Sequence, residues 1–144
     1  MRRLILLTGL ICCGAGLMAQ SKKPLPVKAT GKPSLAKGKL VYTTYCLSCH
    51  QADGGGVPNM NPPLINTPYV LGEKTRLIKI LLNGLNEEVE INGSYYTNPM
   101  PAHNFLKDED IANVLSFVRN NFTNKAPVIT AAEVKKVRDS KEVK

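Results

Sequence analysis

The chain has 144 residues, including four cysteines and two histidines, and its formal net charge at pH 7 is +8. The excess positive charge lies at the two ends, because segment 40–124 has five basic and eight acidic residues and is therefore net −3. The length fits one domain. The acidic balance of the central segment gives no support to a nucleic-acid-binding surface.

Residues 1–19 are predicted to be a secretory signal peptide. Two arginines precede an apolar run of 15 residues, Leu4–Met18, which is short for a membrane span, and Ala19 ends a plausible cleavage site. A retained N-terminal anchor is one alternative. A lipoprotein is another, but no small residue directly precedes Cys12 or Cys13. Export would place the mature protein in the periplasm or another extracytoplasmic compartment.

The first folded element is predicted to follow a tail. Residues 20–33 are rich in Lys and Pro and lack an apolar period, so we expect them to be flexible. Ser34 is a suitable N-cap for a helix that continues through Tyr45. Gly38 lies on the same face as Tyr42 and lowers helix propensity, which indicates that another helix approaches closely there. A merely tolerated glycine is the alternative.

The segment Cys46-Leu47-Ser48-Cys49-His50 has the C-x-x-C-H pattern of covalent haem attachment. The thiols of Cys46 and Cys49 would form thioethers with the two porphyrin vinyl groups, and His50 would bind the iron. A zinc site that adds His103 is an alternative, but the adjacency of Cys49 and His50 is unfavourable for a tetrahedral ion. A thioredoxin-like dithiol lacks a clear preceding strand, and a disulfide would leave His50 without a role.

The central part of the chain is predicted to contain a loop, a helix and a hairpin. Residues 51–61 hold three consecutive glycines and are expected to form a loop that passes the haem edge. The spacing of apolar residues predicts a helix over residues 75–83, and Gly84 is expected to end this helix. Apolar and polar residues alternate over 89–95 on either side of Asn92-Gly93, and this pattern predicts a small β-hairpin.

Two further helices are predicted after an extended loop over residues 98–101. The segment 108–122 is the best helix candidate, with early acidic residues and an apolar face at Ile111, Val114, Leu115 and Val118. Residues 130–133 form a capping box that predicts a short helix through Arg138, within a C-terminal extension over 125–144.

A haem with one histidine ligand leaves the opposite axial position of the iron to be filled. Met100 is favoured, because the flanking prolines hold its segment extended. Met60 follows His50 by only ten residues and is expected to pack within its loop. His103 is a second candidate for the position, and an iron without a sixth protein ligand is a third arrangement.

Together these features resemble the class I cytochrome c family. The shared elements are the spacing from Gly38 through His50, then Pro62-x-Leu64, then Met100-Pro101, and a C-terminal helix that contains Phe117. The resemblance implies an all-α domain over residues 34–124, in which the N- and C-terminal helices cross around a covalently bound haem. The small hairpin is then an insertion before the methionine loop.

The resemblance also implies roles for individual residues. Pro62 and Leu64 would belong to the haem pocket, and the Pro62 carbonyl would accept a hydrogen bond from His50 Nδ1. Lys107 departs from the family pattern, which often has Ser or Thr there, so the helix cap is expected to shift to Asp108. The segments around residues 84–102 are similar to single-haem cytochromes associated with periplasmic dehydrogenases and oxidases.

We therefore expect one covalent haem c and a carrier that transfers one electron at a time between redox proteins, such as a dehydrogenase, an oxidase or a reductase. With His50 and Met100 on the iron, the protein is not expected to be an enzyme by itself. One alternative is a tightly bound electron-transfer subunit of a dehydrogenase or oxidase complex. Another is a haem enzyme or gas sensor with a labile sixth ligand. Membrane contact is expected only through partners or a retained N-terminal segment.

Overall fold

A computed structural model describes residues 31–140 of the chain. The predicted signal peptide and nearly all of the predicted tail lie outside these residues, as do the last four residues of the C-terminal extension. The described part contains six helices and one two-stranded antiparallel sheet, in the order α1 (Leu35–Tyr45), α2 (Leu47–His50), α3 (Pro68–Leu71), α4 (Lys74–Asn83), β1 (Val89–Ile91), β2 (Ser94–Tyr96), α5 (Asp108–Arg119) and α6 (Ala131–Asp139). None of these helices is long and apolar enough to cross a membrane.

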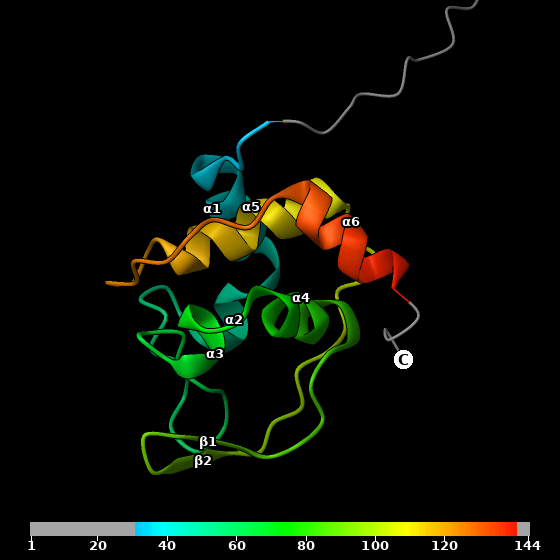
Figure 1. Ribbon diagram of the computed structural model, residues 1–144. Helices are drawn as coiled ribbons and strands as arrows, with labels where there is room; N and C mark the ends of the chain where they lie inside the picture. Colours follow the sequence, from blue (N-terminus) through cyan, green and yellow to red (C-terminus); the bar gives the residue numbers. More distant parts are fainter. Residues whose placement is uncertain (1–30, 141–144) are drawn as a thin grey trace, which may run out of the picture.

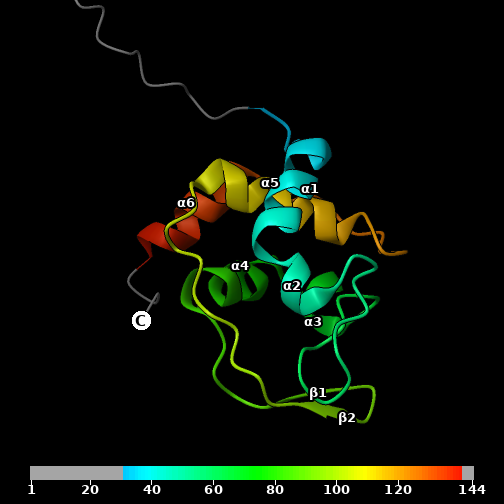
Figure 2. The ribbon, with the colours of Figure 1, turned by 180° about the vertical axis from the view of Figure 1, so that it is seen from behind.

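The first helix and the longest helix cross at one end of the molecule (Figures 1 and 2). The Ser34 side chain caps α1, and its backbone N–H donates to Asn113 Oδ1 on α5 at 2.7 Å. A Cβ atom added to Gly38 would overlap the carbonyl of Asn113 and would lie 2.7 Å from Phe117 Cβ. The close approach predicted at Gly38 is therefore confirmed.

Aromatic side chains fill the space beside this crossing. The ring of Tyr42 lies 5.5 Å from that of Phe117 and 5.3 Å from that of Phe122, measured between centroids. The Tyr42 hydroxyl donates to the carbonyl of Gln51 at 2.6 Å, so α1 also holds the residue that follows α2. The haem-attachment motif is thereby fixed to the main helical core.

The helices α4 and α6 complete the helical half of the molecule. Four apolar residues of α4 are buried, and Gly84 ends this helix with φ of 77°. The predicted capping box of α6 is confirmed, because the Thr130 and Glu133 side chains each accept a hydrogen bond from the backbone of the other residue. Packing of α6 against both α4 and α5 buries Ala131, Val134 and Val137.

The predicted hairpin is confirmed and lies at the end of the molecule opposite the α1–α5 crossing (Figure 1). Val89 pairs with Tyr96 and Ile91 pairs with Ser94. The turn residues Asn92 and Gly93 both have positive φ, at 52° and 79°, as a two-residue type I′ turn requires. Its buried face forms a small apolar cluster that is separate from the main core.

Two predictions about the longest helix are wrong in detail. The helix α5 ends at Arg119 and not at Phe122, because Phe122 and Thr123 have left-handed backbone angles that a helix cannot contain. Lys107 keeps the N-cap position without a side-chain capping bond, and Asp108 is the first helical residue. The cap therefore does not shift to Asp108.

Candidate haem site

An apolar cavity opens between the helical half and the hairpin. Its walls come from α2, the segment after the glycine loop, α4, the hairpin, the methionine loop and α5. It brings together every residue predicted to hold or contact a haem, namely Cys46, Cys49, His50, Pro62, Leu64 and Met100. Met60 is not among the described residues that line it, and its side chain is 49% exposed.

His50 lies at the end of α2 and is only 8% exposed. Its Nδ1 is 2.9 Å from the Pro62 carbonyl oxygen, which is the contact that the family resemblance implies. The carbonyl can only accept, so Nδ1 carries the proton and Nε2 carries the lone pair. Burial lowers the pKa of His50; the Pro62 hydrogen bond opposes this shift, and the nearby His103 adds to it. The ring is therefore neutral at pH 7, which is the form that binds a metal.

The two cysteines occupy the same turn of chain, and neither forms a disulfide. Burial, followed by the neighbouring Cys49, raises the pKa of the Cys46 thiol to about 11. A reactive dithiol has a lowered pKa, so this thiol is unlike that of a thioredoxin-like centre. Among residues 31–140, no three His, Cys, Asp or Glu side chains gather as a group that could hold a metal ion.

Met100 lies on a segment that pairs with the chain leaving α4. The N–H of Met100 donates to the Leu85 carbonyl at 2.8 Å, and the N–H of Leu85 donates to the Met100 carbonyl at 2.9 Å. This pairing holds the backbone of Met100 at the cavity, and its half-buried side chain packs against the main core. Leu85 has no sequence signal for this role, because no local pattern indicates which residue will pair in an isolated bridge.

His103 lines the same cavity and is 8% exposed. Its backbone N–H donates to the Leu81 carbonyl at 2.8 Å, and its ring lies 5.8 Å from that of Phe105 and 6.4 Å from that of Tyr45. Its Nδ1 has no hydrogen-bond partner among the described residues. The second candidate for the sixth ligand thus belongs to the cavity wall as Met100 does.

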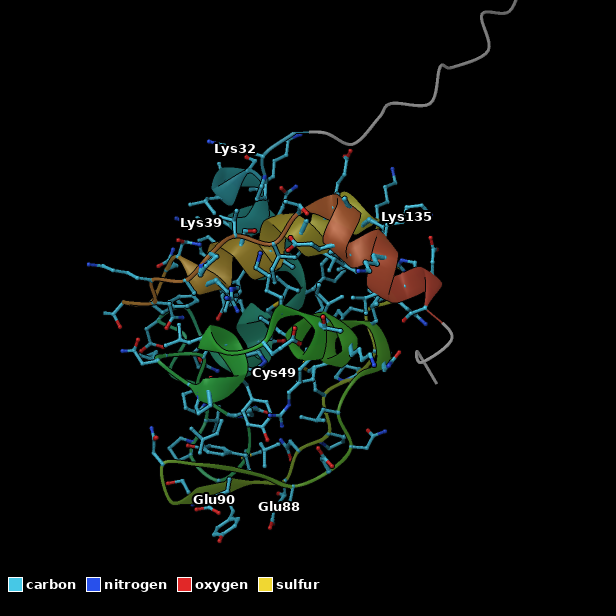
Figure 3. The ribbon with its side chains drawn as sticks, viewed as in Figure 1. Lys32, Lys39, Cys49, Glu88, Glu90 and Lys135 are labelled. Atoms are coloured by element: carbon cyan, nitrogen blue, oxygen red, sulfur yellow. The ribbon has the colours of Figure 1, made fainter. Side chains whose placement is uncertain are left out.

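Five charged residues mark opposite ends of the molecule. Figure 3 shows Lys32, Lys39 and Lys135 at the end formed by α1 and α6, whereas Glu88 and Glu90 lie just before and on the hairpin at the opposite end. The hairpin contributes to the cavity wall through Val89 and Ile91. Glu88 and Glu90 therefore lie next to the part of the cavity wall that the hairpin forms, and the three lysines lie at the other end of the molecule.

The chemistry of the cavity fits a haem. Apolar walls suit the faces of a porphyrin, two thiols on one turn suit its vinyl groups, and a neutral imidazole and a thioether are ligands that haem iron accepts. A zinc ion, a redox dithiol or a disulfide would each leave some of these groups unused.

Comparison with known proteins agrees with this fit. Residues 35–122 match the family model of cytochrome c. The chain is 36% identical over 115 residues to cytochrome c-552 of Thermus thermophilus, a match that covers 74% of this chain and 87% of that protein. It is also 36% identical over 115 residues to the cytochrome c subunit of a quinone alcohol dehydrogenase from Gluconacetobacter polyoxogenes, covering 78% of this chain and 24% of that subunit.

A third relative is the cytochrome c subunit of gluconate 2-dehydrogenase from Pantoea cypripedii, 32% identical over 110 residues, with 74% of this chain and 25% of that subunit covered. The chain thus spans about a quarter of the length of these dehydrogenase subunits and most of the length of the Thermus cytochrome. The family match begins with α1, ends just after α5 and includes the haem-attachment motif and Met100. The chain therefore belongs to the cytochrome c family, as a class I cytochrome with covalently bound haem c.

Proposed function

We propose that this protein is an exported single-haem carrier in which His50 and Met100 are the axial ligands of the iron. The observation that carries the proposal is that both side chains line the cavity to which the two attachment cysteines also belong. When bound, the haem supplies a one-electron couple at its iron. The protein supplies the attachment, the ligands and the exclusion of water.

Each residue then has a distinct task. Cys46 and Cys49 fix the porphyrin edge. The Pro62 carbonyl orients the His50 ring and keeps its proton on Nδ1, so that Nε2 is the nitrogen directed to the metal. Met100 offers a neutral, soft thioether, which favours the ferrous state and thus a high reduction potential.

A six-coordinate iron has no position for a substrate, so we propose that the protein has no turnover of its own. Electrons would pass through the haem edge to and from partner proteins. Carbon monoxide should bind the reduced protein slowly, because it must first displace Met100. Fast carbon monoxide binding together with peroxidase turnover would instead favour the haem enzyme or gas sensor.

We propose that residues 1–19 direct export to the periplasm, that 20–33 form a tail, that 34–124 form the haem domain and that 125–144 form an extension.

The high coverage of cytochrome c-552 supports a free-standing carrier. The names of the dehydrogenase subunits support a dehydrogenase as the electron donor, and they favour a permanently bound subunit as the second candidate. Gel filtration of native periplasm, followed by haem staining, separates the two candidates by size.

The ligand assignment is tested by paired substitutions. Ferric haem with a thioether ligand shows a weak near-infrared charge-transfer band, which should vanish in Met100→Ala and persist in the matched variant Met60→Ala. The reduction potential should fall in Met100→Ala, because a harder ligand favours the ferric state. A Met100→Ala spectrum identical to that of the unaltered protein would refute the assignment.

A further inference from the structure

The last helix lies beyond the region that matches the cytochrome c family, which ends at residue 122, and yet it is firmly seated on the haem domain. The Ser116 hydroxyl of α5 donates to the Ile129 carbonyl at 3.0 Å and accepts from the Ile129 N–H at 2.9 Å. Lys74 of α4 donates to Glu133 at 2.8 Å. The linker and the start of α6 are thus attached to two helices of the domain.

The last turn of α6 reaches the loop that carries Met100. There Arg138 donates from Nε to Asp108 Oδ1, from Nη1 to the Asn104 carbonyl and from Nη2 to the Leu106 carbonyl, each at 2.7 Å. The guanidinium is planar and presents its donors in a fixed fork, so three simultaneous bonds define the position of the loop. The side chains of Arg138 and Asp108 are 29% and 27% exposed, so solvent screens this pair only in part.

These contacts complete a series of attachments along one loop. Leu85 holds the backbone at Met100, the Leu81 carbonyl holds it at His103, and Arg138 holds the segment between His103 and α5. Lys107, at the N-cap of α5, makes no side-chain capping bond. Arg138 holds this end of the segment through Asp108, which precedes it by 30 residues in the chain.

We propose that Arg138 is a positioning residue that determines how readily the Met100 loop opens and releases the iron. The inference rests on the proposed ligation by Met100. External ligands such as imidazole bind the ferric haem only after Met100 has left, so their binding reports the population of the open loop. Charge-assisted hydrogen bonds are among the stronger ones in proteins. Because their loss destabilises the closed loop, it should raise the population of the open loop about tenfold.

The test measures imidazole binding to the ferric holoprotein, from the shift of the Soret band, alongside thermal unfolding. Arg138→Gln should bind imidazole about tenfold more tightly than the unaltered protein. Arg138→Lys keeps the charge but loses the fork, and its affinity should lie between the two. The matched control is Lys74→Met, which breaks another ion pair of α6, 2.8 Å long, without touching the loop. It should lower the unfolding temperature but leave imidazole binding unchanged.

The proposal is overturned if both Arg138 variants bind imidazole like the unaltered protein, or if Lys74→Met raises binding as much as Arg138→Gln does. If Arg138→Gln does not fold, Arg138→Lys carries the same comparison. A failure of the proposed ligation is distinguishable, because imidazole would then bind the unaltered protein and Met100→Ala equally well. That result would remove the ligand assignment and this inference together.

Discussion

Replacing Gly38 by alanine tests the helix crossing that supports the haem-attachment motif. The added Cβ would lie 2.7 Å from Phe117 Cβ, whereas carbon atoms in contact normally lie about 3.5–4.0 Å apart, so α1 and α5 must separate by about 1 Å. The backbone carbonyl of Asn113 also overlaps the new atom and cannot be moved by rotating a side chain. The separation would strain the 2.7 Å bond from Ser34 N–H to Asn113 and the packing of Tyr42 on Phe117.

The magnitude follows from two opposing effects. Overpacking of this kind costs about 1–3 kcal/mol, and an overlap with backbone lies at the upper end of that range. Alanine recovers about 1 kcal/mol relative to glycine within a helix. We therefore expect the free energy of unfolding to fall by about 2 kcal/mol in Gly38→Ala.

Guanidinium unfolding of the holoprotein, followed by far-ultraviolet circular dichroism, measures this difference. The matched control is Lys39→Ala on the same helix, where the side chain is exposed and the change should stay within about 0.5 kcal/mol. Gly38 does not line the cavity, so the reduction potential should not change. An unfolding free energy in Gly38→Ala equal to or above that of the unaltered protein would show that the helices do not meet as described.

Three further predictions concern the haem, the last helix and the tail. Acid–acetone extraction should leave the haem colour with the protein, and haem that extracts freely would contradict attachment through Cys46 and Cys49. Burial would raise the pKa of Glu133, but hydrogen bonds from Lys74 and Thr130 lower this pKa below the ordinary value of 4.5. The ionised Glu133 side chain therefore contributes stability above pH 4.5, and this contribution is lost as the pH falls below 4.5. The Glu133→Gln variant keeps a capping residue, and its melting temperature should depend less on pH below 4.5 than that of the unaltered protein. The same dependence of melting temperature on pH in both proteins would argue against the ion pair with Lys74. Deleting residues 20–33 should leave the spectrum and the potential unchanged but should weaken the salt dependence of electron transfer, because the tail is basic whereas segment 40–124 is net −3.

Local features of the sequence are sufficient to predict most helices and the hairpin. Ser34, Gly84 and the Thr130 capping box each mark a helix boundary through bonds to residues within one turn, and Asn92-Gly93 marks the hairpin in the same way. The short helix α3 is not among the predicted elements, although its signal is also local. Thr67 accepts from the Val70 N–H at 3.2 Å, and Pro68 occupies the first helical turn, where its missing N–H costs nothing.

Features that depend on distant contacts could not be predicted in this way. The early end of α5 is one example: Phe122 adopts φ of 53°, and its ring packs against Tyr42 and Phe117 and lies against Gly54. The apolar pattern of the segment cannot distinguish this arrangement from one more helical turn. The bridge from Leu85 to Met100 is likewise long-range, and so are the bonds that Arg138 makes to carbonyls more than 30 residues away.

The two sides of the cavity are held by different parts of the fold, and this separates their expected responses to mutation. His50 is fixed through Pro62 and through the Tyr42 contact to Gln51, and the second of these depends on α1 and its crossing with α5. The Met100 loop is fixed by the chain around α4 and by α6. Weakening the crossing should therefore lower global stability without loosening the Met100 loop, whereas removing the Arg138 fork should loosen that loop at a smaller cost in stability. The contrary result is that the change in imidazole affinity is proportional to the change in unfolding free energy, with the same constant for Gly38→Ala and Arg138→Gln. Release of Met100 would then require global unfolding, and the loop would have no independent opening for Arg138 to control.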